Sequence, residues 1–296
     1  LPSFVIIGAM KCATSTLAEQ LGAQPGVRMC DPKEPNFFSD DDTFARGLDW
    51  YASLFEDAPD GVALGEASTH YTKLPVHPDA CERMRKVLPD AKLIYVMRHP
   101  IDRIVSQYVH EWTQRLVTGP IDDAIRENRW MVDYGRYAMQ LEPWVAAYGA
   151  ERILPVFTEA IRAEPQRELD RAWDFLGLPG APSWQDLGDS NVSAHRLRRS
   201  PLRDAVVEAP ILKQVRRGLV PRSVRDRVKG LWQMRSKPEM GAAMRGELET
   251  IYDDDLARLG ELLGLERGEL TCDSFGEVAL RPGHRFVRPV RCGDSA

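Results

Sequence analysis

Short apolar runs that end at a polar turn recur along the chain, separated by stretches long enough to hold helices. Three of these runs are predicted to be buried strands: Phe4–Gly8, Lys92–Met97 and Arg152–Phe157. Each is apolar at consecutive rather than alternating positions, which is typical of parallel strands that are covered on both faces.

Between and after these strands, apolar residues recur three and four positions apart, which is the spacing of an amphipathic helix. The predicted helices are Ser15–Ala23, Ile101–Thr113, Tyr137–Tyr148, Pro165–Leu176 and Met240–Leu263. Strands that alternate with helices predict an α/β fold, in which a mainly parallel sheet is flanked by helices on both faces.

The remaining segments have no clear period. Residues 179–191 are rich in Pro, Gly, Asp and Ser and are predicted to form a loop. Residues 193–236 are predicted to form two or three short helices, broken at Pro201, Pro210 and Pro221. The end of the chain, residues 269–296, is expected to be irregular or to form a short hairpin.

These segments predict a single domain over residues 1–296. Its core is expected at about residues 1–178 and 237–268, with a basic helical insertion at about 193–236 in the C-terminal third. Hydrophobic residues make up 43% of the chain and charged residues 28%, so an ordinary globular core is expected.

Charge is distributed unevenly along the chain. The net charge is −5, yet residues 195–237 carry 13 Lys and Arg against 3 Asp and Glu. A basic segment on an acidic body indicates an anionic ligand, a carrier protein or a peripheral membrane surface as its partner, and a solvated helical face is the alternative. Because Trp232 is its only aromatic residue and no DNA-binding motif is present, no nucleic-acid partner is expected.

The five cysteines are widely spaced and form no close pairs of the kind that bind zinc, so no metal site is expected. This usage favours reduced thiols and a cytoplasmic protein. A disulfide between Cys272 and Cys292 is the alternative for the C-terminal end. No run approaches the roughly 18 apolar residues that a membrane-spanning helix needs.

The first chemical motif is G-A-M-K-C-A-T-S-T-L, residues 8–17, between the first strand and the first helix. A loop that leads into a helix directs backbone N–H groups and the positive end of the helix dipole at an anion. Lys11 adds a charge, and three hydroxyls follow it. The second glycine of the nucleotide-triphosphatase loop G-x-x-x-x-G-K-[ST] is missing. By itself the motif also fits an ordinary turn with a surface lysine.

The second motif is V-M-R-H-P-I-D-R-I-V-S-Q-Y, residues 96–108, which follows the strand Lys92–Met97. Arg98 comes at the carboxyl end of that strand, where open α/β sheets bind ligands. Ser106 follows two helical turns later. An arginine fork and a hydroxyl together suit a phosphate group.

The two motifs, in this order, resemble those of the sulfotransferases that use 3'-phosphoadenosine-5'-phosphosulfate (PAPS). The similarity is closest to the branch of heparan sulfate glucosaminyl sulfotransferases and their bacterial relatives. The resemblance implies a P-loop-like fold in which Arg98 and Ser106 bind the 3'-phosphate. It also implies that the first loop binds the 5'-phosphosulfate through Lys11, Cys12, Ala13, Thr14, Ser15 and Thr16.

Three further segments resemble the same branch. P-K-E-P-N-F-F, residues 32–38, implies Glu34 as the catalytic base, and G-E-A-S-T-H-Y-T, residues 65–72, implies a segment that lines the acceptor side. G-R-Y-A-M-Q-L-E-P-W, residues 135–144, resembles the helix before the fourth core strand of the family. His70 competes with Glu34, because a histidine is the base in the cytosolic branch; joint action of the two is a third reading.

The resemblance implies transfer of a sulfuryl group from PAPS to a hydroxyl, in preference to an amine, of a carbohydrate, glycolipid or specialised metabolite. Lys11 is implied to stabilise the leaving phosphate, and no metal is required. Arg235 and Lys237 approximately match a basic loop that contacts the 3'-phosphate in relatives. Two other functions stay open: a P-loop small-molecule kinase, and a non-catalytic nucleotide-binding protein on the same fold.

Overall fold

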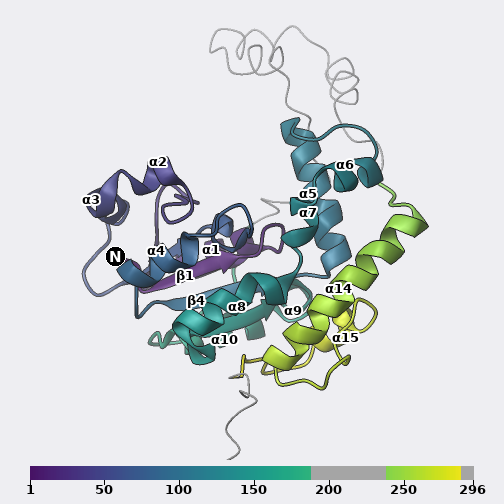
Figure 1. The fold of residues 1–296 in the computed structure, drawn as a ribbon. Coiled ribbons are helices and arrows are strands. Elements are labelled where there is room, and N and C mark those ends of the chain that lie inside the picture. Colours follow the sequence, from purple (N-terminus) through teal and green to yellow (C-terminus); the bar gives the residue numbers. More distant parts are fainter. Residues whose placement is uncertain (188–237, 288–296) are drawn as a thin grey trace, which may run out of the picture.

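The computed structural model describes residues 1–187 and 238–287, and these are the residues to which the structural statements below refer (Figure 1). Their sheet has five strands, all parallel, in the order β2-β3-β1-β4-β5. The strands are β1 (Phe4–Gly8), β2 (Val27–Met29), β3 (Ala63–Ala67), β4 (Lys92–Met97) and β5 (Ile153–Phe157). The predicted α/β class with a parallel sheet is therefore confirmed.

Strand β1 lies at the centre of the sheet, and all five of its residues are buried. It pairs with β3 through Phe4 and Gly65 and with β4 through Phe4 and Lys92. After β1 the chain builds β2 and β3 on one side and then crosses to β4 on the other side. The order of the strands thus reverses at β1, and ligands of open α/β sheets bind at the carboxyl ends of the strands beside such a reversal.

Helices join and flank the strands (Figure 1). In the first half of the chain they are α1 (Thr14–Gly22), α2 (Asp41–Phe44), α3 (Gly47–Ser53), the 3₁₀ turn η1 (Thr69–Thr72), α4 (Ala80–Val87) and α5 (Pro100–Gln114). The others are α6 (Ile121–Glu127), α7 (Trp130–Asp133), α8 (Tyr137–Tyr148), η2 (Ala150–Arg152), α9 (Thr158–Ala163), α10 (Pro165–Leu176), α14 (Ala242–Leu262) and α15 (Phe275–Ala279).

The five predicted helices are confirmed as α1, α5, α8, α10 and α14, and their ends agree to within two residues. Helix α10 ends at Gly177, whose φ of 72° is the left-handed conformation that commonly follows a helix. The short elements β2, β3, α2, α3 and α4 were not predicted. The segment 135–144 leads into α8, which precedes β5.

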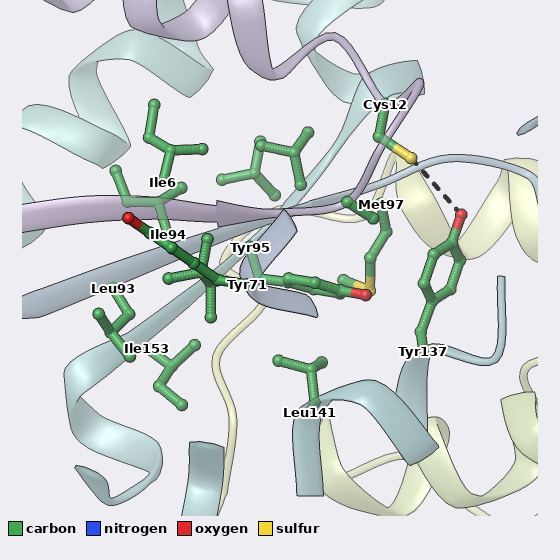
Figure 2. Packing of buried hydrophobic residues seen from close by; sticks show 14 of the residues in the cluster. Ile6, Cys12, Tyr71, Leu93, Ile94, Tyr95, Met97, Tyr137, Leu141 and Ile153 are labelled. Carbon is green, nitrogen blue, oxygen red and sulfur yellow. Dashed lines mark hydrogen bonds between the residues drawn. The ribbon is translucent and has the colours of Figure 1, made fainter. Parts of the chain in front are cut away.

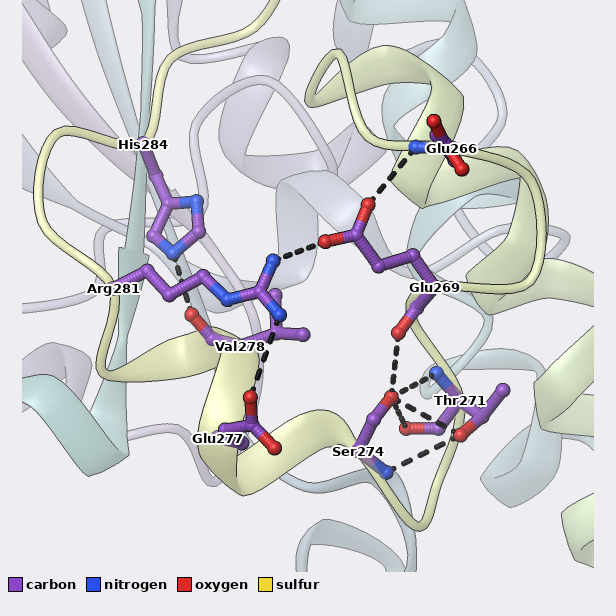
Figure 3. Close-up of polar contacts among 8 residues, drawn as sticks. All are labelled: Glu266, Glu269, Thr271, Ser274, Glu277, Val278, Arg281 and His284. Carbon is purple, nitrogen blue, oxygen red and sulfur yellow. Dashed lines mark hydrogen bonds and ion pairs between the residues drawn. The ribbon is translucent and has the colours of Figure 1, made fainter.

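The C-terminal end differs from the prediction of an irregular segment or a hairpin. It contains helix α15, and Phe275 of this helix is fully buried. Figure 3 shows the polar contacts that hold this end together: Arg281 pairs with Glu269 and Glu277, and the Ser274 hydroxyl donates to the Glu269 carbonyl at 2.7 Å. The aromatic contact of Phe275 with Phe157 at the end of β5 draws the segment onto the core, which periodicity alone did not reveal.

Helix α14 lies alongside α8 and fixes its start. The buried carboxylate of Asp255 accepts hydrogen bonds from the backbone N–H groups of Ala138 (2.8 Å) and Met139 (3.0 Å) in the first turn of α8. A carboxylate at this point satisfies N–H groups that the helix itself leaves open. Burial raises the pKa of Asp255 to about 6. A segment late in the chain therefore determines where α8 begins.

Some predictions concern residues outside the described part of the chain. They are the basic insertion at 193–236, the candidate ligands Arg235 and Lys237, and Cys292 of the alternative disulfide. Among the described helices, none has the length and apolar character needed to cross a membrane.

Candidate active site

The loop after β1 runs close to the turn η1. A Cβ added to Gly8 would lie 1.9 Å from Oγ1 of Thr72, so a larger residue at position 8 would push η1 away. The same Thr72 hydroxyl donates to the carbonyl of Ile7 at 2.9 Å. Glycine at position 8 therefore allows η1 to pack on the carboxyl end of β1.

Helix α1 presents an open N-terminus to this loop. Its N-cap residue is Ala13, which has a left-handed φ of 63° and no side-chain cap. The N–H of Leu17 makes the first helical bond, to the carbonyl of Ala13 at 3.2 Å, so the N–H groups of residues 14–16 precede the helical ladder. Thr14, Ser15 and Thr16 thus combine N–H groups, hydroxyls and the positive end of the dipole, as an anion requires.

Cys12 points away from this loop into the core. Its Sγ lies 3.6 Å from the hydroxyl of Tyr137, a contact that is drawn as a dashed line in Figure 2, and burial raises the pKa of the thiol to about 11. Its carbonyl accepts from the Thr158 hydroxyl at 2.9 Å, and its N–H donates to Ala9 at 3.2 Å. The side chain of Cys12 therefore anchors the loop, and the predicted ligand contact would have to come from neighbouring residues.

Arg98 and Ser106 follow β4, the strand that pairs with β1, and Ser106 lies in α5. Arg98 follows β4 directly, and its guanidinium is 3.8 Å from the Asp102 carboxylate on the first turn of α5. Ser106 stands one helical turn beyond Asp102, so these two residues lie on one face of α5. Nε of Arg98 is buried without a hydrogen-bond partner among the described residues.

Glu34 stands in a loop that is held by its neighbours. Its backbone has a φ of 53°, and Phe37 stacks on Tyr51 with ring centroids 4.4 Å apart. The N–H of Asn36 donates to the Ser68 hydroxyl at 3.1 Å, which ties the loop to the end of β3. The position of Glu34 therefore depends on β3 and on an aromatic cluster.

Glu66 on β3 is buried beside the aromatic side chains that include Phe37 and Tyr51. Its carboxylate accepts hydrogen bonds from the hydroxyls of Tyr71 (2.6 Å) and Tyr51. Burial raises the pKa of Glu66. The glutamate of the G-E-A-S segment thus supports the loop of Glu34 from behind.

His70 lies in η1 and stacks on His77, with ring centroids 5.0 Å apart and an interplanar angle of 17°. Burial, followed by the nearby charge of Lys73, lowers the pKa of His70 to about 4. The imidazole is therefore neutral at physiological pH, and a neutral imidazole is able to accept a proton.

Two charged residues of the site carried no recognisable signal in the sequence. Lys73 ends η1 and is 7% exposed, and Glu111 lies on α5 and is 4% exposed. Burial lowers the pKa of Lys73 to about 8, against the opposing charges of Glu111 and Glu34. Lys73 thus interacts electrostatically with both carboxylates. Since Lys73 and Glu111 belong to no motif, only the fold reveals that they lie near one another.

In the described part of the chain, no group of three or more His, Cys, Asp and Glu side chains is arranged to hold a metal ion. The candidate residues instead surround the carboxyl ends of β1, β3 and β4: the loop of Lys11, the turn of His70 and Lys73, and Arg98. A parallel α/β sheet whose central strand leads through a loop into a helix is an arrangement in which many proteins bind nucleotides.

The comparisons with known proteins find similarity to sulfotransferases. Residues 45–186 match the model of the sulfotransferase family. The chain is 34% identical over 190 residues to human (Homo sapiens) heparan sulfate glucosamine 3-O-sulfotransferase 6, which covers 60% of the chain and 52% of that protein. It is 28% identical over 198 residues to the human bifunctional heparan sulfate N-deacetylase/N-sulfotransferase 1, covering 60% of the chain and 22% of the relative.

A sulfotransferase from Alicyclobacillus acidocaldarius has a similar fold, with a TM-score of 0.63, 24% identity, and coverage of 90% of this chain and 97% of that one. The chain is thus similar to sulfotransferases in sequence over residues 45–186 and in overall fold. It spans about half the length of the 3-O-sulfotransferase relatives that it matches. The family match begins at residue 45, after Lys11 and Glu34, so the roles of these two residues rest on their motifs and on geometry.

Proposed function

We propose that this protein transfers a sulfuryl group from PAPS to a hydroxyl group of an acceptor. The proposal rests on one observation. Two candidate anion sites follow the neighbouring strands β1 and β4 of a sulfotransferase fold. One is the open N-terminus of α1 beside Lys11, and the other is Arg98 with Ser106. PAPS carries its two anionic groups at opposite ends of one nucleoside, as two such sites require.

The proposed donor contacts follow from this arrangement. The N–H groups of residues 14–16 and the ammonium of Lys11 bind the 5'-phosphosulfate, and the guanidinium of Arg98 with the Ser106 hydroxyl binds the 3'-phosphate. Asp102, 3.8 Å from the guanidinium, orients Arg98. Charged hydrogen bonds of this kind are stronger than neutral ones.

In the proposed reaction the acceptor oxygen attacks sulfur in line with the departing phosphate. The new O–S bond forms as the bond between sulfur and the 5'-phosphate oxygen breaks, and its electron pair stays on the phosphate. Lys11 and the start of α1 stabilise that developing charge. Alignment and electrostatics supply most of the rate, as in phosphoryl transfer.

Glu34 is proposed as the base that takes the proton of the acceptor. Its loop is fixed by the contacts of Asn36 with Ser68 and of Phe37 with Tyr51, so that the carboxylate is positioned before the acceptor arrives. His70 is the second candidate because it is neutral at physiological pH, but a pKa lowered to about 4 makes it a weaker base than an ordinary histidine. A hydroxyl of a carbohydrate is the proposed acceptor, supported by the sequence similarity to heparan sulfate 3-O-sulfotransferases.

Label transfer tests the proposal. PAPS that carries radioactive sulfur is incubated with the protein and with acceptors that include heparan sulfate oligosaccharides, simple glycosides, glycolipids and amines. We expect the label in a hydroxyl-bearing acceptor and one equivalent of 3'-phosphoadenosine-5'-phosphate (PAP) for each transfer. Transfer of the γ-phosphate of ATP to the same acceptors, with no transfer from PAPS, would establish a kinase instead.

A further inference from the structure

Lys73 stands where the loop of Lys11 begins. It follows Thr72, whose hydroxyl is bonded to the carbonyl of Ile7 near the end of β1. The residue is only 7% exposed, and its Nζ lies 5.6 Å from the centroid of the Tyr134 ring. Burying an ammonium costs free energy unless other groups compensate for it, so the position of Lys73 needs a reason.

The carboxylates near Lys73 act at longer range than an ion pair. Glu111 and Glu34 both raise the pKa of Lys73 by their charge, yet neither forms an ion pair with it within 4.0 Å. Glu111 also interacts electrostatically with Lys11, so it lies within range of both lysines. The two carboxylates therefore balance the charge of Lys73. Its ammonium donates no hydrogen bond to another described residue.

The other polar groups around Lys73 do not supply an available positive charge in its place. Arg103 is committed elsewhere, since it donates to Gln107 at 2.6 Å and to the Met131 carbonyl at 2.5 Å. His70 is neutral because its pKa is lowered to about 4, and burial raises the pKa of Tyr134 to about 12. Lys73, with a pKa of about 8, is mostly charged at neutral pH.

Building on the proposed function, we propose that the ammonium of Lys73 binds the sulfonate oxygens of PAPS and that the charge of buried Glu111 stabilises the ammonium there. Lys11 would then face the phosphate side of the sulfur, and Lys73 the side nearer Glu34. Lys73 donates hydrogen bonds and transfers no proton; the acceptor proton still goes to the base. The site thereby distinguishes PAPS from PAP, which has the same nucleotide but no sulfonate.

The test compares the binding of PAPS and PAP by calorimetry in Lys73→Met and the wild type. Because a hydrogen bond to a charged group is lost, we expect the Kd of PAPS to rise at least about tenfold. The Kd of PAP should stay within about twofold of the wild-type value, and this binding also shows that the variant is folded. Glu111→Gln should weaken PAPS selectively, but by less.

Two further variants complete the test. Lys86→Met removes an exposed lysine that pairs with Glu82 on α4, away from the site, and should leave both Kd values unchanged. Lys73→Arg keeps the charge and should retain the preference for PAPS. In the wild type, the affinity for PAPS relative to that for PAP should decline as the pH rises through about 8. In Lys73→Arg this relative affinity should persist.

Equal losses of affinity for PAPS and PAP in folded Lys73→Met, or no loss for either, would overturn the inference. If Lys73→Met does not fold, the pH comparison of the wild type decides. The range from pH 7 to pH 9.5 spans the pKa of Lys73, which is about 8, so a wild-type preference for PAPS over PAP that stays constant over this range would also overturn the inference. A wild-type protein that binds neither nucleotide would instead refute the proposed function, and this outcome is distinct from the others.

Discussion

The hydroxyl of Tyr137 donates a hydrogen bond of 2.5 Å to the backbone carbonyl of Arg98 and accepts one of 3.2 Å from the Arg98 N–H. It also lies 3.6 Å from Sγ of Cys12 (Figure 2). One side chain from α8 therefore connects the residue after β4 to the loop after β1. Both proposed anion sites depend on this contact, although Tyr137 touches neither anion in the proposed arrangement.

Tyr137→Phe should consequently weaken nucleotide binding and stability together. The change leaves buried polar groups of the Arg98 backbone without a partner, which costs about 1–3 kcal/mol of the free energy of unfolding. Urea denaturation and calorimetry with PAP measure the two effects. Tyr148→Phe is the matched control, because the buried Tyr148 hydroxyl on the same helix has no hydrogen-bond partner among the described residues. If Tyr148→Phe costs as much as Tyr137→Phe, the special role of Tyr137 is refuted.

Arg98 and Lys11 should affect different quantities. Arg98→Ala removes a charged contact to the 3'-phosphate and should weaken PAP binding by roughly 1.5–3 kcal/mol. Lys11→Ala should instead lower kcat more than it weakens binding, because its interaction strengthens as charge develops on the leaving phosphate. Steady-state kinetics and PAP titration of both variants measure this difference. Identical effects on binding alone would contradict the two roles.

The identity of the base is tested by Glu34→Gln, which keeps the shape of the side chain and removes its basicity. We expect kcat to fall by roughly 10²-fold or more, while the Kd of PAP changes little. His70→Ala should cost less and act mainly on the KM of the acceptor. Near-normal turnover in Glu34→Gln with an inactive His70→Ala would assign the role to His70.

The pH profile of turnover is a weaker test of the same question. An unperturbed histidine would give an acidic limb near pH 6.5. Burial lowers the pKa of His70 to about 4, which is within the ordinary range of a carboxylic acid. An acidic limb near pH 4 therefore does not distinguish the two bases, and the variants have to decide.

Asp255 gives a prediction about stability and pH. Its pKa of about 6 in the folded protein is above the ordinary value of 3.8, so the folded state binds this proton more tightly than the unfolded state does. The contribution of Asp255 to stability therefore falls as the pH rises from about 4 to about 6. Asp255→Asn does not titrate, so its stability relative to the wild type should improve by roughly 1–3 kcal/mol between pH 4 and pH 7.

Urea denaturation at a series of pH values measures that difference. Asp254→Asn is the control, since Asp254 is the exposed neighbour on the same helix and should show little change. A stability difference for Asp255→Asn that moves in the opposite direction with pH would show that the buried carboxylate is favoured in its charged form.

The sequence predicted the elements whose own residues define them. Strands β1 and β4 are continuous apolar runs, and α5 and α10 have clear apolar faces, so both position and type could be read. Strand β3 was not predicted because Gly65 and Glu66 interrupt its apolar pattern. Glu66 is stable there because two tyrosines from other segments donate hydrogen bonds to it. Helix α15 was not predicted for a similar reason, since it is ordered by the ring contact of Phe275 with Phe157, which is distant in the sequence.

The candidate site divides in the same way. Lys11, Glu34, Arg98 and Ser106 lie in motifs with characteristic spacing, so they could be identified before the fold was known. Lys73 and Glu111 are isolated charged residues, and their proposed role rests on burial and on electrostatic interaction across different elements. Such a pair has no signature in one sequence, because the distance that makes it chemically relevant is created by folding.

The most direct measurement of the central claim is a calorimetric titration of the whole chain with PAP, ATP and NAD, each with and without Mg²⁺. Lys11 and Arg98 are proposed to bind the two phosphates without a metal, so we predict that PAP binds tightly, that Mg²⁺ does not change its affinity, and that ATP and NAD bind far more weakly. Tight, Mg²⁺-dependent binding of ATP with no response to PAP would contradict the assignment of the site to sulfuryl transfer.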